Sequence, residues 1–359
     1  MTRPVPSEGL DPVHADASRR YRRLNALRVL GLLGIVALIV IAVAMDFTHG
    51  PSPLALGDLW RALVSPGKVS PEVGVIVWQV RLPYALMAVL VGACLGLAGG
   101  EMQTILNNPL ASPYTLGVSA AAAFGAALAI VLDMHIPGVP VSWQVPINAF
   151  AFALASALIL DGVARWRALP TAGVVLMGIA LVFVFHALVS LLQFVATEDA
   201  LQGLVFWTLG SLVRADWTKL AVLAIALLFG LILALRQSWA MTALRLGEDR
   251  AASFGVDVKR LRLGTLLRVS ALSALTVSFV GTIGFIGLIS PHIARALFGE
   301  DHRFYLPGCV TVGALVMSLA SIASKGILPG VIIPVGIVTA LVGIPFFLVI
   351  VVRASGRMS

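Results

Sequence analysis

Ten strongly apolar runs follow one another along this chain of 359 residues, and the polar segments between them are short. A helix that crosses a bilayer needs about 20 mostly apolar residues, and lipid offers no partner for free backbone groups. Since 59% of the residues are hydrophobic and only 12% are charged, no region has the composition of a soluble domain. We therefore predict an all-α, polytopic membrane protein with ten transmembrane helices. The spans are expected near residues 29–45, 82–106, 115–132, 146–164, 171–194, 218–235, 263–281, 283–298, 306–324 and 334–352.

The basic residues predict the orientation of these spans. With the N-terminus in the cytoplasm, 19 of the 25 Lys and Arg residues fall on inner segments or their flanks, and six fall on outer ones. Inner loops of membrane proteins carry such an excess, so we expect both termini to be cytoplasmic. The same asymmetry explains the net charge of +8, and we expect no nucleic-acid partner.

A single ten-helix domain is expected over residues 29–352, between two cytoplasmic tails. Residues 1–28 combine several prolines with many charges, a composition typical of disorder, and residues 353–359 form the second tail. The first apolar run is longer than that of a secretory signal, so we expect it to remain as the first span. Cys94 and Cys309 lie in apolar runs without a C-x-x-C pattern, which indicates packing residues.

Two segments interrupt the regular spans. Residues 269–294 are uncharged over 26 positions, which is too long for one span and too short for two. Glycines at 281, 284 and 287 predict a break there and a half helix near 283–298; the break either lines a pathway or only permits close helix packing. An Asn- and Pro-rich turn at 107–113 ends another helix. Glu101, shortly before that turn, either braces the inner mouth or is a solvated charge.

One short segment, residues 244–255, is polar and charged although it stands between two spans. It combines Glu248, Asp249 and Arg250 with several small residues. In a chain otherwise solvated by lipid, such a segment indicates contact with a soluble partner that pushes on it.

Three groups of motifs occur in order along the chain. The first is Arg-Leu-Pro at 81–83, followed by Gly92, Gly99, Gln103, Asn-Pro-Leu-Ala at 108–111 and Leu-Gly at 116–117; the second is residues 246–256; the third covers 284–295, 301–303, Pro307, 334–340 and 343–346. Together they resemble the FecCD-type permease subunits of type II ABC importers, the group that takes up haem, iron–siderophores and cobalamin. The resemblance covers nearly the whole chain beyond the N-terminal tail.

The resemblance implies the type II ABC importer fold: a homodimer of ten-span protomers in the bacterial inner membrane, with a translocation path on the two-fold axis. It implies two cytoplasmic ATP-binding subunits and a periplasmic haem-binding protein as partners. No phosphate-binding loop motif occurs here, so the chain is not expected to be an enzyme, ATP is expected on the partner subunits, and no permanent cofactor is expected. Coupling helices are expected at about 241–256, and the residues assigned to contact with the ATPase are Leu246, Gly247, Glu248, Asp249, Arg250, Ala251, Ala252 and Gly255.

Arg81 and Lys325 match outer basic positions that, in the family, dock carboxylates of the binding protein. Lysine lacks the bidentate fork of arginine, which weakens the match at Lys325. For Arg81 the alternative is an ordinary charge at the membrane interface. The chain departs from the family pattern at Tyr84, where a second basic residue is usual, and at Ser321 and Ile332, where acidic residues are usual. We therefore expect the usual ion pair within the last outer loop to be missing.

Segments 206–212 and 281–284 are more similar to haem permeases than to siderophore permeases, so the resemblance implies haem as the transported substrate. His186, with Ser190 and Gln193 on the following turns, is either a neutral imidazole that contacts haem iron or a buried histidine bonded to a neighbouring helix. His292 is typical of the family across substrates. The path and gate candidates are Gln103, Asn108, His186, Gly284, Gly287 and His292, and no resident metal site is expected.

Three alternatives stay open. Within the class, the same machinery could carry cobalamin or an iron–siderophore. An ion-coupled secondary transporter should carry ionisable residues deep in its spans, and this chain has almost none. An intramembrane enzyme would need a nucleophile with a base, or a metal cluster, at membrane depth, and His186 without a partner carboxylate does not supply one.

Overall fold

The computed structural model describes residues 12–50, 54–167, 171–328 and 330–355. Every regular element among them is helical. The long helices are α1 (Pro12–Thr48), α4 (Leu82–Ile105), α5 (Val118–Val131), α6 (Val141–Trp166), α7 (Thr171–Val195), α9 (Trp217–Arg236), α12 (Val258–Val280), α13 (Ile286–Phe298), α14 (His302–Gly326) and α15 (Val335–Ser355). Shorter elements are α2 (Leu56–Val64), η1 (Pro66–Lys68), α3 (Pro71–Val75), η2 (Ile76–Arg81), η3 (Pro113–Leu116), α8 (Glu198–Thr208), η4 (Leu212–Arg214), α10 (Ser238–Leu244) and α11 (Glu248–Ser253).

The helices suit a membrane by length and composition. Seven of those described are long and apolar enough to cross one, and three shorter apolar helices, Val118–Val131, Ile286–Phe298 and Val335–Val349, accompany them. The all-α membrane class is thereby confirmed. The number of ten crossings stays a prediction, because the three shorter helices fall below the usual spanning length.

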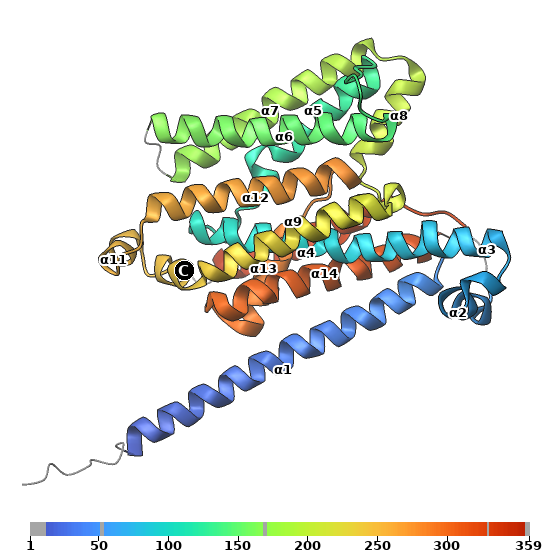
Figure 1. Cartoon of the computed structure of the whole chain (residues 1–359). Helices are drawn as coiled ribbons and strands as arrows, with labels where there is room; N and C mark the ends of the chain where they lie inside the picture. Colours follow the sequence, from blue (N-terminus) through green and yellow to red (C-terminus); the bar gives the residue numbers. More distant parts are fainter. Residues whose placement is uncertain (1–11, 51–53, 168–170, 329, 356–359) are drawn as a thin grey trace, which may run out of the picture.

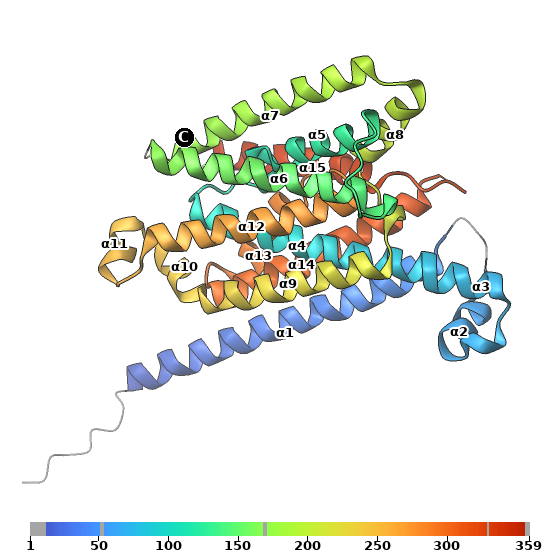
Figure 2. The ribbon, with the colours of Figure 1, turned by 45° about the horizontal axis from the view of Figure 1, so that its top comes forward.

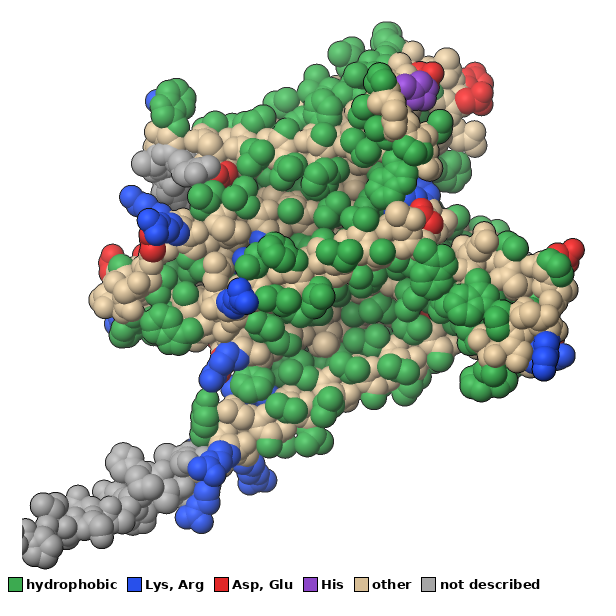
Figure 3. Space-filling model, in the orientation of Figure 1, with side chains coloured by type: hydrophobic (Ala, Val, Ile, Leu, Met, Phe, Trp, Pro, Cys, Tyr) green, Lys and Arg blue, Asp and Glu red, His purple; other side chains and the backbone are tan. Residues whose placement is uncertain are grey.

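The long helices run roughly side by side, and the short helices lie at the two ends of the bundle (Figures 1 and 2). α10 and α11 lie at one end, near the start of α1, whereas α2, α3 and α8 lie at the other. Hydrophobic side chains cover the middle of the face in Figure 3, and Lys and Arg side chains gather mainly toward the end with α10 and α11.

Helix α4 forms the centre of the packing, and glycines let its neighbours approach closely. A Cβ atom on Gly92 would lie 2.2 Å from the carbonyl oxygen of Gly313 in α14, and one on Gly99 would lie 1.8 Å from that of Gly287 in α13. Real atoms do not approach so closely, so only glycine fits at these contacts. Small residues at helix contacts are how membrane helices gain packing energy, since lipid tails are as apolar as leucine.

Both predicted breaks are confirmed. α12 ends at Val280, residues 281–285 are not helical, and α13 starts at Ile286. Gly281 has φ +80°, and Phe285 has φ +66°, a left-handed conformation that is uncommon for a bulky residue. α4 likewise ends at Ile105, before the turn that holds the Asn-Pro motif.

Three expectations need correction. The tail was expected to be disordered to residue 28, but α1 begins at Pro12; residues 1–11 and 356–359 lie outside the described part. The second span was expected to start near residue 82, but helix continues from Pro71 through a π-helical turn into α4. Glu101 is not a solvated charge: it is fully buried and receives two hydrogen bonds from Arg268 Nε of α12, at 3.0 and 2.9 Å.

Candidate functional site

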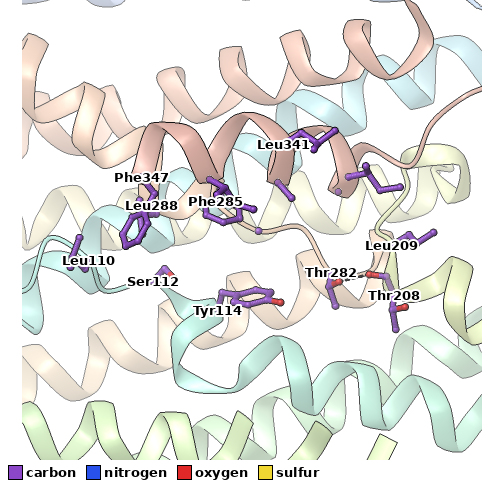
Figure 4. A pocket seen from close by; sticks show the side chains of 15 residues that line it. Leu110, Ser112, Tyr114, Thr208, Leu209, Thr282, Phe285, Leu288, Leu341 and Phe347 are labelled. Atoms are coloured by element: carbon purple, nitrogen blue, oxygen red, sulfur yellow. Dashed lines mark hydrogen bonds between the residues drawn. The ribbon is translucent and has the colours of Figure 1, made fainter. Parts of the chain in front are cut away.

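A largely apolar cavity of about 630 Å³ lies against the break between α12 and α13. Figure 4 shows side chains from α15 and α13 on one side of it and Tyr114, Thr208 and Thr282 on the other. Among the predicted path residues, Gly284 lines it directly. The lining residues are Leu110, Ser112, Tyr114, Thr208, Leu209, Thr282, Gly284, Phe285, Leu288, Gly336, Ile337, Ala340, Leu341, Ile344 and Phe347.

Backbone hydrogen bonds hold this cavity wall in place. The Ser211 N–H donates to Val280 O at 2.7 Å, and the Gly336 N–H donates to Gly210 O at 3.1 Å. The Thr282 hydroxyl donates to Thr208 O (Figure 4). These bonds tie the end of α12 and Thr282 to the segment after α8, and tie that segment to the start of α15.

A second, smaller cavity of about 290 Å³ shares Tyr114, Thr208 and Thr282 with the first. It contains His186, together with Ser190 and Gln193 of the same helix. His186 is exposed rather than buried in this chain. The three α7 side chains therefore line one pocket, as expected, and the role of His186 stays a prediction.

Three of the other predicted path residues, Gln103, Gly287 and His292, lie around α13 and not in the cavity lining. Gln103 is buried, donates to Leu288 O at 3.5 Å and accepts from Arg295 at 3.2 Å. Gly287 packs on Gly99, and the ring of His292 stands 6.2 Å from that of Phe346 in α15.

The other predicted path residue, Asn108, lies in the turn after α4. Its side chain accepts a hydrogen bond from Leu110 N–H at 2.9 Å. Asn108 therefore shapes the turn that brings Leu110 to the cavity.

The charged segment, residues 244–255, holds the short helix α11, and α10 ends at its first residue. α11 begins after Gly247, whose φ of +106° suits glycine, and Gly255, at φ +83°, turns the chain toward α12. Ala251 is fully buried, whereas Leu246, Glu248, Asp249, Arg250 and Ala252 are exposed. The buried alanine fixes α11 to the bundle and leaves its charged side available to a partner.

A polar network connects these short helices to the helices around the cavity. Arg245, at the end of α10, donates to Asn107 Oδ1 at 2.7 Å and to Glu300 Oε1 at 2.6 Å. Arg295 of α13 also pairs with Glu300, at 3.3 Å. The hydrogen bond from Arg245 lowers the pKa of the Glu300 carboxyl, so this carboxylate stays ionised at neutral pH. These contacts join the end of α10 to the turn after α4 and, through Glu300, to α13.

His302 completes the network, although sequence reasoning gave it no role. Its Nε2 lies 2.8 Å from Thr104 Oγ1 of α4, and its Nδ1 lies 3.1 Å from Thr242 Oγ1 of α10. The His302 ring therefore joins α4 to α10. The Asp-His-Arg motif at 301–303 was the only signal that could have indicated it.

At the opposite end, Lys325 and Arg81 point into the protein. Lys325 forms an ion pair with Asp46 of α1 at 3.1 Å, and Ser321 donates to the same carboxylate at 2.8 Å. Arg81 donates to Phe47 O and Thr48 O at 3.2 and 3.0 Å. α1 therefore supplies the carboxylate that the last outer loop lacks, and docking through Arg81 and Lys325 stays a prediction.

Comparison with known proteins decides the family. Residues 37–353 match the FecCD transport family. The chain belongs to this family. It is 35% identical over 284 residues to the hemin transport system permease protein HmuU of Yersinia pestis, which covers 79% of this chain and 85% of HmuU. It is 36% identical over 304 residues to the vitamin B12 import system permease protein BtuC of Salmonella typhi, which covers 84% of this chain and 90% of BtuC.

The fold of this FecCD-family chain also matches a solved structure. A metal-chelate type ABC transporter in an inward-facing conformation superposes with a TM-score of 0.77 at 33% identity, over 90% of this chain and 98% of that one. The chain is therefore a membrane permease subunit of the type II ABC importer class. The resemblance inferred from the motifs is confirmed at this level.

Proposed function

We propose that this FecCD-family permease moves haem from a periplasmic binding protein into the cytoplasm of a bacterium. The observation that carries the proposal is the apolar cavity at the α12–α13 break, with a polar pocket that contains His186 directly beside it. The flat apolar macrocycle of haem suits the apolar cavity. The imidazole of His186 suits haem iron, for which imidazole is a common ligand. The similarity to HmuU supports the same substrate.

Transport requires partners in this proposal. Two chains form a homodimer around the path, and two cytoplasmic subunits hydrolyse ATP. α10 and α11 contact these subunits, and both termini lie on their side of the membrane. The exposure of Glu248, Asp249 and Arg250 and the gathering of basic side chains at that end support this orientation (Figure 3).

Cobalamin is the second candidate, because BtuC is named for vitamin B12 import and is as similar to this chain as HmuU. An iron–siderophore is compatible with the same cavity. In either case the fold, the partners and the coupling segment are those proposed for haem.

The experiment is ATP-dependent uptake into proteoliposomes that contain the chain and its cognate ATPase. Binding proteins loaded with haem, cobalamin or a ferric siderophore are added in turn. We expect uptake of haem, and we expect His186→Ala to lower it about tenfold, as for loss of one good contact worth about 1.4 kcal/mol.

His135→Ala, which changes an exposed histidine before α6, is the matched control and should transport as the wild type does. Uptake of cobalamin or siderophore alone would reject haem while leaving the permease function in place. If His186→Ala took up haem as fast as the wild type, His186 would not contact the transported haem.

A further inference from the structure

A groove of about 570 Å³ runs between α1 and the corner where α13 meets α14. It shares no lining residue with the substrate cavity. Its walls include Leu24, Leu27 and Leu297, all of which are exposed. Because this part of α1 belongs to an apolar membrane-spanning helix, the groove opens toward lipid.

Two glycines of α1 give the groove its depth. A Cβ atom on Gly34 would meet nothing within 4 Å, so this position faces empty space. A Cβ atom on Gly31 would lie 3.2 Å from the ring of Phe298, which forms the floor. A smooth chain of methylene groups therefore fits along α1, whereas a bulky side chain at position 34 would fill the space.

The end of the groove nearest α10 and α11 is basic. Arg28 lines it, and Arg20 lies two helical turns earlier on the same face of α1. The Arg28 guanidinium stacks on Phe304 at 5.3 Å and stands 4.0 Å from Asp301 Oδ2. These two contacts leave most of its five N–H donors for another ligand.

Asp301 does not cancel the charge of Arg28, because it is already paired. Arg303 Nη2 lies 2.7 Å from Asp301 Oδ2, and Arg303 Nε donates to Oδ1 at 3.0 Å. Arg303 therefore neutralises the carboxylate at much shorter range than Arg28 does. The net charge at this end of the groove is positive.

We propose that the groove holds one anionic phospholipid, with an acyl chain along Gly31 and Gly34 and the phosphate on Arg28 and Arg20. A lipid tail gains little by leaving the bilayer for an equally apolar groove, so charge decides which lipid stays. Basic residues at the membrane surface favour anionic lipids by about fivefold each. The occupied groove would join α1 to the α13–α14 corner, which carries Glu300 and His302 of the polar network.

The test uses the full chain purified from membranes that contain phosphatidylglycerol and phosphatidylcholine. Native mass spectrometry then counts the lipids that remain bound. We expect one retained phosphatidylglycerol per chain in the wild type. Gly34→Leu should abolish its retention by filling the groove, and Arg28→Gln should lower it about fivefold and remove the preference over phosphatidylcholine.

Gly162→Leu and Arg61→Gln are the matched controls. Position 162 also faces open space, on α6, and Arg61 is an exposed arginine at the other end of the bundle. Both variants should retain phosphatidylglycerol as the wild type does, and helicity and elution volume check the fold of all four. Loss of lipid from the controls, retention by Gly34→Leu, or no lipid on the wild type would overturn the proposal. A change of oligomeric state in Gly34→Leu would instead assign the groove to a second copy of the chain.

Discussion

Replacement of Glu101 by glutamine is expected to destabilise the protein by about 3–5 kcal/mol, the usual cost of leaving one charge of a buried ion pair without its partner. Glu101 is fully buried in α4, and Arg268 of α12 is nearly so. Arg268 also donates to Gln237 and Thr265, at 3.2 and 3.3 Å, but these neutral groups cannot balance its charge. The measurement is the unfolding midpoint in detergent micelles, followed by tryptophan emission.

The double variant Glu101→Gln/Arg268→Met should recover much of this loss, because it removes both buried charges together. Glu72→Gln, at an exposed position before α4, is the matched control and should unfold as the wild type does. If Glu101→Gln and Glu72→Gln unfolded at the same midpoint, the ion pair would not hold α4 against α12.

Replacement of Gly99 by alanine is expected to cost about 3 kcal/mol, at the upper end of overpacking effects. The added methyl group would lie 1.8 Å from Gly287 O and 2.7 Å from Gly287 Cα, so α4 and α13 must separate. Backbone atoms cannot rotate away as a side chain can. Because α13 carries Leu288 into the cavity wall, we expect transport activity to fall together with the unfolding midpoint.

Gly162→Ala is the control for this variant, since its methyl group meets no atom within 4 Å. Alanine favours helix over glycine by about 1 kcal/mol, so this control should be unchanged or slightly stabilised. Of the two Gly→Ala changes, only Gly99→Ala is thus expected to destabilise the protein. A Gly99→Ala protein as stable and active as the wild type would show that α4 and α13 are not packed as closely as described.

Features that depend on local sequence were predictable. Glycines at 281 and 284 can adopt or adjoin conformations that end a helix, so the break could be located. The charged residues 248–250 cannot lie in lipid, so the short helix that holds them could be located as well. The fold class followed from the apolar runs alone. The lower limit of α1 was missed because composition cannot show whether a polar segment continues an adjoining helix.

Contacts between distant helices could not be predicted from one sequence. Glu101 and Arg268 are 167 positions apart, and Asp46 and Lys325 are 279 apart. The motif resemblance located Arg81 and Lys325 but could not show that both charges are satisfied inside the protein. Likewise, the sequence indicated Gly284 as a path candidate but not that Tyr114, Thr208 and Thr282 line the same cavity (Figure 4).

The central claim is that α10 and α11 transmit the action of an ATPase to the substrate path. Its most direct test is the amount of substrate taken up per ATP hydrolysed in proteoliposomes. The variant that replaces Glu248, Asp249 and Arg250 with alanine should lower this ratio about tenfold, within the 1–3 kcal/mol typical of coupling between sites. A control with Asp133→Ala and His135→Ala, an exposed pair in the turn after α5, should keep it. Wild-type uptake per ATP in the triple variant would contradict the account.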